Sequence, residues 1–185
     1  DGKHPFRVVE HGSWKVQQGV NWIEFAHELT DPSGQGYRYV KRMTLTPNKP
    51  ELVIDHSLTN TGQQNIVTDV YNHNFFVLNN LPTGPDFAVR FPFELTGDRD
   101  LKGYAKLQGK ELVYEKEIKA GDNVFAMLTG YGESETDNAF TIEHRVAKAG
   151  VRVSTDRPIE KLRFWSPRTT VCPEPFVHLH IPPNN

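Results

Sequence analysis

The chain has 185 residues, of which 37% are hydrophobic and 24% charged, and its formal net charge is −2 at pH 7. This length allows one well-buried domain or an unusually compact pair, and the composition is that of a globular chain, not a disordered or membranous one. Because there is no basic excess, nucleic acid is not expected as a partner. No apolar run approaches the roughly 18 residues that a membrane-spanning helix needs, so no membrane partner is expected either.

Short alternating runs of β-branched and aromatic residues, separated by Gly, Pro, Asn and Asp clusters, predict strands along the whole chain. In chain order the predicted strands are Phe6–Val9, Ser13–Gln17, Trp22–Glu28, Tyr37–Thr46, Glu51–Asn60, Gln64–Val77, Phe87–Phe93, Glu111–Glu117, Asn123–Thr129, Ala139–Arg145, Gly150–Ser154, Ile159–Trp165 and Val171–Ile181. So many short strands predict an all-β fold, a large antiparallel β-sandwich. No linker or composition break divides the chain, which predicts one domain over residues 1–185.

The strongest functional signal is His73, within the predicted strand Gln64–Val77. Alternation places one set of side chains on a common face, namely Asp69, Tyr71, His73 and Phe75, and the opposite set on the other, namely Val70, Asn72, Asn74 and Phe76. Histidine is suited to proton transfer near neutral pH, and aromatic rings can cover the C–H faces of a pyranose. Asn72 and Asn74 favour a ligand-facing role for the triplet. The competing interpretation is a structural histidine with satisfied hydrogen bonds.

A second candidate is Glu174, which lies between Pro173 and Pro175. The two prolines remove backbone donors and stiffen the approach to the carboxylate. Glu174 is therefore either a rigidly presented general base, or acceptor for sugar hydroxyls, or else an exposed glutamate at a kink in an edge strand. The residue pattern supports the two interpretations about equally.

The remaining candidates carry weaker signals. Trp165 is either a sugar-stacking platform or a core residue. His178 and His180 share one face of the last predicted strand and could bind a metal only with a third ligand, so an exposed edge is the better interpretation. His56 is expected to form a cross-strand hydrogen bond. Cys172 is the single cysteine, which excludes an internal disulfide and is expected to be inert. No glycine-rich phosphate loop or nucleophile elbow is present, so no cofactor is expected.

Four segments together resemble the galactose mutarotase (aldose 1-epimerase) superfamily. They are Leu58-Thr-Asn-Thr-Gly62, Asn72-His-Asn-Phe-Phe-Val-Leu78, Phe164-Trp165 and Val171-Cys-Pro-Glu-Pro175. The resemblance implies a β-supersandwich with a sugar-binding groove, in which His73 protonates the ring oxygen and Glu174 takes the proton of the anomeric hydroxyl. Ring opening and closure then interconvert the anomers, with no metal or cofactor. The substrate-binding residues would include Tyr71, Asn72, Asn74, Phe75 and Trp165.

Members of the superfamily are longer, and their site uses an arginine and a second histidine upstream of the matched region. The resemblance therefore implies that segments at the N-terminal end are missing, and it makes His4, about ten residues before Trp14, a further substrate-binding candidate. Two alternatives stay open: a carbohydrate-binding module without turnover, and a structural sandwich domain of a larger carbohydrate-active protein. The chain begins at Asp1, which indicates a processed or excised start, and the sequence leaves the compartment and the oligomeric state open.

Overall fold

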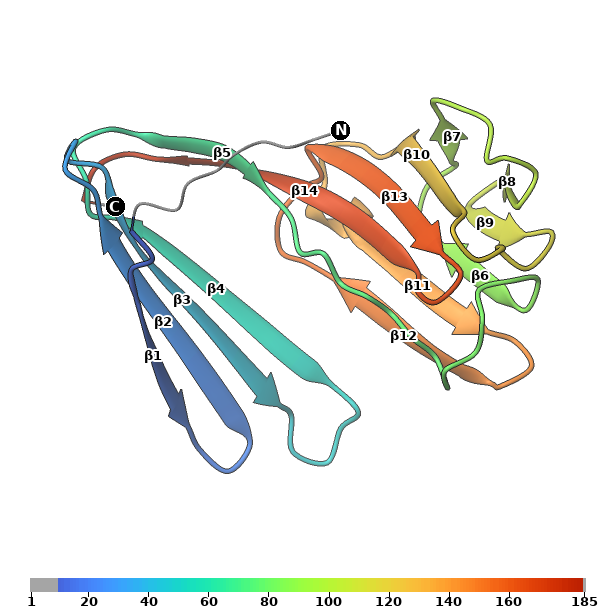
Figure 1. Ribbon diagram of the computed structural model, residues 1–185, viewed down its shortest axis with the longest axis horizontal. Helices are drawn as coiled ribbons and strands as arrows, with labels where there is room; N and C mark the ends of the chain where they lie inside the picture. Colours follow the sequence, from blue (N-terminus) through green and yellow to red (C-terminus); the bar gives the residue numbers. More distant parts are fainter. Residues whose placement is uncertain (1–9, 185) are drawn as a thin grey trace. The chain divides into compact units, whose positions relative to one another are not determined.

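The computed structural model describes residues 10–184, and their regular secondary structure is β apart from one turn of 3₁₀ helix, η1 (Glu135–Asp137). The strands form three sheets, and the paired strands run antiparallel, which confirms the predicted fold class (Figure 1). The chain divides into two compact units: unit 1 ends at Thr68 and resumes at Leu179, and unit 2 is Asp69–His178. The single domain stays a prediction. The predicted strand Phe6–Val9 and the candidate His4 lie outside the described residues.

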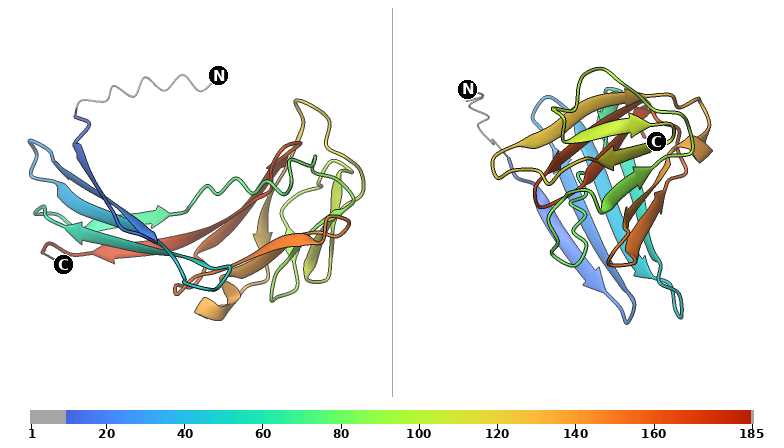
Figure 2. Two further views of the ribbon diagram at one scale, coloured as in Figure 1. Left: turned by 90° about the horizontal axis from the view of Figure 1, so that it is seen from below. Right: turned by 90° about the vertical axis from the view of Figure 1, so that its right-hand side faces the viewer.

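Unit 1 contains a four-stranded sheet in chain order, which the views in Figure 2 show as one twisted layer. Its strands are β1 (Ser13–Gln18), β2 (Trp22–Thr30), β3 (Gly36–Leu45) and β4 (Leu52–Asn60). The register gathers apolar side chains on one face, among them Trp14, Val16, Ile23, Phe25, Tyr39, Met43, Ile54 and Leu58. The other face is charged and includes an Arg38–Glu28 ion pair of 3.1 Å. Period-two patterning therefore specifies the two faces of this sheet, as expected for antiparallel strands.

The Asn60-Thr-Gly62 element of the resemblance has a structural role within unit 1. Asn60 is 1% exposed, and its Nδ2 donates to the carbonyl oxygens of Gln64 (2.7 Å) and Ile181 (2.9 Å), while Oδ1 accepts from the amide of Gly62. A Cβ at Gly62 would lie 2.5 Å from the backbone nitrogen of Gly36, so only glycine fits this close approach. This part of the motif thus organises a turn instead of a ligand site.

Unit 2 is a β-sandwich of two sheets. One has the order β5-β14-β13-β10-β7 and the other the order β12-β11-β6-β9-β8. The strands of the first sheet are β5 (Ile66–Val70), β7 (Thr96–Gly97), β10 (Asn123–Thr129), β13 (Lys161–Pro167) and β14 (Cys172–Ile181). Those of the second are β6 (Phe87–Arg90), β8 (Ala105–Gln108), β9 (Glu111–Tyr114), β11 (Ala139–His144) and β12 (Ala149–Ser154). The neighbouring strands β5 and β14 each include residues of both units.

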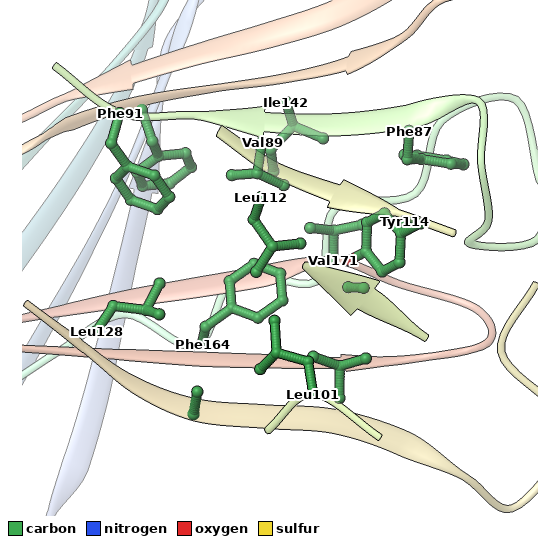
Figure 3. Close-up of a cluster of buried hydrophobic side chains, with 14 of the residues drawn as sticks. Phe87, Val89, Phe91, Leu101, Leu112, Tyr114, Leu128, Ile142, Phe164 and Val171 are labelled. Atoms are coloured by element: carbon green, nitrogen blue, oxygen red, sulfur yellow. The ribbon is translucent and has the colours of Figure 1, made fainter. Parts of the chain in front are cut away.

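The core of unit 2 lies between these sheets. Val89, Leu112 and Ile142 come from one sheet and Leu128 and Phe164 from the other, and each is at most 1% exposed. Figure 3 shows these side chains gathered in one cluster. Removing this much apolar surface from water is the main term that stabilises the sandwich.

The predicted strand Gln64–Val77 is wrong in its second half. Regular pairing stops at Val70, and the chain rejoins the sheet only through a single bridge between Phe76 and Val171, whose two N–H···O bonds measure 3.1 and 3.2 Å. The hydroxyl of Thr170 also donates to the carbonyl of Phe76 (3.0 Å). His73 therefore lies in an irregular segment, not on a regular strand. The short strands β7 and β8 were not predicted.

Candidate functional site

The candidate site lies on the face of the β14-β13 pair that points away from the core of unit 2. In β13, Leu162 and Phe164 are fully buried in the core, so alternation turns Arg163 to the opposite face. The register pairs Arg163 directly with Glu174 of β14. Two residues from sequence-adjacent but antiparallel strands thus meet on one surface.

His73 and Glu174 are in contact, with His73 Nδ1 3.3 Å from Glu174 Oε1. The carboxylate is 2% exposed and the imidazole side chain 38% exposed, so the pair is open to solvent mainly through the histidine. The interpretation of Glu174 as an exposed residue at a kink in an edge strand is wrong, because its side chain is buried and β14 lies between β5 and β13 in the sheet. Its flanking prolines occupy the alternate positions of β14, opposite the core residues Leu162 and Phe164.

Arg163 occupies the other side of the same carboxylate. Its Nε lies 2.7 Å from Glu174 Oε2, and its side chain is 30% exposed. Nε itself is buried and has no acceptor in line with its N–H, so the contact is a close approach of opposite charges and not an aligned hydrogen bond. Glu174 thus has a titratable group at Oε1 and a permanent cation at Oε2.

Aromatic rings surround this charged pair. The His73 ring stacks on Phe75 at 4.4 Å with a 10° interplanar angle, and it meets the edge of Trp165 at 5.5 Å. Tyr71 packs on Phe176 at 4.2 Å, and the guanidinium carbon of Arg163 lies 4.9 Å from the Tyr71 ring centre and 5.0 Å from that of Phe176. Phe75 remains 59% exposed. The face therefore offers an open apolar ring surface beside the His73–Glu174 contact.

A second charged group consists of Asp69 in β5, Lys161 in β13 and His178 in β14. Asp69 accepts a hydrogen bond from Lys161 Nζ at 2.9 Å through Oδ2, and His178 Nδ1 lies 2.8 Å from Oδ1. Hydrogen bonds from Lys161 and then His178 hold the pKa of the Asp69 carboxyl below its usual range. All three side chains are at least 30% exposed, so they add polar surface next to the aromatic rings.

The structure brings together five of the eight predicted site residues: His73, Glu174, Tyr71, Phe75 and Trp165. Asn72 is exposed and Asn74 half-buried, and both adjoin His73 in the chain. His4 lies outside the described residues.

Sequence reasoning missed Arg163 and Phe176. Arg163 could have been found, because Leu162 and Phe164 are apolar and the alternation of β13 places the arginine beside Trp165.

The other candidates have structural explanations. His56 Nδ1 lies 2.7 Å from the hydroxyl of Tyr39 on the neighbouring strand, which confirms the predicted cross-strand hydrogen bond. Cys172 is fully buried, and this burial raises the pKa of its thiol to about 11, consistent with an unreactive side chain. Among residues 10–184, no group of three or more His, Cys, Asp or Glu side chains could hold a metal ion. No helix in this part of the chain is long and apolar enough to cross a membrane.

Comparison of the chain with protein-family models, with curated proteins and with solved structures found no match. The fold class and the geometry of unit 2 therefore carry the functional argument, together with the short motifs that resemble the mutarotase superfamily.

Proposed function

We propose that unit 2 binds a free aldose over this face and interconverts its anomers by proton transfer, as in aldose 1-epimerases. The observation that carries the proposal is the contact of 3.3 Å between His73 and the buried carboxylate of Glu174, beside the exposed ring of Phe75. A histidine and a carboxylate are a suitable donor and acceptor near neutral pH. The aromatic rings supply a surface for the C–H face of a sugar.

The proposed reaction balances its protons within this pair. Glu174 takes the proton of the anomeric hydroxyl, the bond between C1 and the ring oxygen breaks, and protonated His73 delivers a proton to that oxygen. Rotation about the bond between C1 and C2 and the reverse transfers close the ring on the other face. The anomeric oxygen and the ring oxygen are both bonded to C1, so the side chains that exchange protons with them must lie close together.

Glu174 is reached past His73, because the carboxylate is 2% and the imidazole 38% exposed. No sugar ring fits into a 3.3 Å contact, so the sugar would bind on the exposed side of the pair and displace the imidazole from Oε1. Proton transfer then needs distances of about 2.6–3.2 Å to the reacting oxygens. Two carboxylates on this face, Asp69 and Glu174, are balanced by Lys161 and Arg163, which suits an uncharged sugar.

The test is anomer exchange of freshly dissolved α-aldoses, followed by polarimetry or by NMR saturation transfer. The wild type should accelerate exchange above buffer, and H73Q and E174Q should each reduce the rate by about 10²-fold or more. His180 is an exposed histidine of the same strand, so H180Q should leave the rate unchanged and serves as the matched control. Folded wild-type protein without acceleration for any of several hexoses and pentoses would rule out the proposal.

A second candidate is sugar binding without turnover, which the burial of Glu174 favours. A carboxylate that is 2% exposed and engaged at both oxygens is difficult for a sugar hydroxyl to reach. Calorimetry with the same sugars separates the two functions: saturable binding without anomer exchange would establish a binding module. Absence of both at millimolar sugar would exclude both.

A further inference from the structure

Arg163 is held against Glu174 by its own surroundings. It faces Glu174 across the β13-β14 register, and its guanidinium carbon lies 4.9 and 5.0 Å from the ring centres of Tyr71 and Phe176, which pack on each other at 4.2 Å. The guanidinium therefore lies beside the ring pair, and its contact with both rings adds cation–π attraction that a surface ion pair lacks. The position of its charge beside Oε2 is therefore part of the folded structure.

The charge of Arg163 acts directly on the carboxylate of its partner. A carboxylate buried without a cation is costly, since burial disfavours the charged form. Arginine stays protonated at all relevant pH values, so its charge beside Oε2 does not depend on the state of His73. Without Arg163, the imidazole alone would have to balance this buried negative charge.

We propose that Arg163 is a positioning residue of the His73–Glu174 pair: it holds the Glu174 side chain and favours its charged form through Oε2, and it leaves Oε1 to face the imidazole and to accept the exchangeable proton. This inference rests on the proposed sugar chemistry for its purpose, but the state of the pair can be measured without any sugar. It assigns Arg163 no direct contact with the reacting atoms.

The other groups around the pair do not supply this charge. The 71–76 segment contributes Tyr71 beside His73, and β13 contributes Trp165. On β14, Cys172 has a thiol with a raised pKa and is neutral near pH 7. A more distant group on the same face consists of Asp69, Lys161 and His178, in which Lys161 and His178 both contact Asp69. Within the described chain, Arg163 is the one permanent cation at ion-pair distance from Glu174.

The experiment is an NMR titration of the His73 ring in the whole protein, with R163Q, R163K and a control. Removing the permanent charge should raise the pH at which the pair takes up its first proton by about one unit in R163Q, whichever partner holds that proton. R163K keeps the charge and should titrate near the wild type. R168Q is the control, because Arg168 forms a comparable ion pair of 2.8 Å with Glu117 that is half-exposed; its midpoint should not change.

An unchanged midpoint in folded R163Q would overturn the assignment. If R163Q does not fold, R163K decides instead: its ammonium lacks the planar fork, so anomer exchange should fall by about tenfold or more in kcat with little change in KM. Full activity of R163K would then contradict a positioning role. Failure of the proposed function looks different, since the wild type would show no anomer exchange while the titration shift in R163Q persisted.

Discussion

The buried contact between Arg163 and Glu174 predicts strong thermodynamic coupling, which a double-mutant cycle can measure. The variants are E174L, R163M and the double variant. Each single change removes one charge from the 2.7 Å contact and strands the other. The double change replaces both charges by apolar side chains of similar size, so neither charge is left buried without its partner and the loss should be smaller than the sum of the single losses.

The magnitudes follow from the exposure of each partner. R163M leaves a carboxylate that is 2% exposed with only His73 in ion-pair distance, so we expect it to lower the free energy of unfolding by about 3 kcal/mol. E174L leaves an arginine that is 30% exposed and partly hydrated, so about 2 kcal/mol is expected. If the double variant loses about 2 kcal/mol, the coupling free energy is about 3 kcal/mol.

The assay is urea unfolding followed by tryptophan fluorescence. Trp165 adjoins the pair, whereas Trp14 and Trp22 lie in unit 1, so their replacement by Phe makes the signal report on unit 2. With Trp14 and Trp22 replaced by Phe, the fluorescence follows the unfolding of unit 2 alone, so the unfolding of the two units is not fitted as a single two-state transition. Single variants whose effects add to within about 0.5 kcal/mol would refute the reasoning, because independent sites behave in that way.

Three further predictions follow from local geometry. G130A should lower the free energy of unfolding by about 3 kcal/mol, because the φ angle of Gly130 is +120° and a Cβ would lie 1.8 Å from the carbonyl oxygen of Glu94. G121A is the control: the φ angle of Gly121 is +84° but the space around it is open, so the loss should be only about 1 kcal/mol. Equal losses in urea unfolding would contradict this prediction. Burial raises the pKa of Cys172 to about 11, so the contribution of its neutral thiol to stability is complete below about pH 9 and is lost as the pH rises toward 11. Over that range the free energy of unfolding of the wild type should fall by about 2 kcal/mol relative to that of C172A. Parallel stability curves for the two proteins would contradict this prediction. W165A should weaken sugar binding by about tenfold in calorimetry while its circular dichroism spectrum remains unchanged, and full affinity would remove Trp165 from the site.

The sequence allowed the fold class and much of the site to be predicted. Asn123–Thr129 was predicted and is found with the same bounds, because its buried positions alternate strictly. Tyr71, His73 and Phe75 do lie beside one another, with His73 stacked on Phe75 at 4.4 Å, although this segment is not a regular strand. Alternation is a local property, so it can be read without knowing which strands pair.

What could not be predicted depends on partners distant in sequence. Nothing near Arg163 in the sequence indicates that it faces Glu174, because this contact is set by the β13-β14 register. The burial of Glu174 likewise follows from the packing of β14 and not from its flanking prolines. β5 ends at Val70, and the next contact of the chain with the sheet is the pair of backbone hydrogen bonds between Phe76 and Val171, which are nearly a hundred residues apart in the sequence. Two-residue β7 is shorter than any periodicity can reveal.

The irregular course of the chain around His73 bears on the proposed reaction, in which a sugar has to reach Glu174. Between Val70 and the bridge at Phe76, His73 has no partner in the strand ladder and is placed by its ring contacts with Phe75 and Trp165. Displacing its imidazole from Oε1 is a side-chain movement that breaks no backbone hydrogen bond, and what it has to give up are the ring contacts with Phe75 and Trp165. Glu174, in contrast, lies in β14 with Arg163 at its Oε2. In the proposed reaction, a fixed acceptor would therefore stand behind a donor that can yield to the sugar.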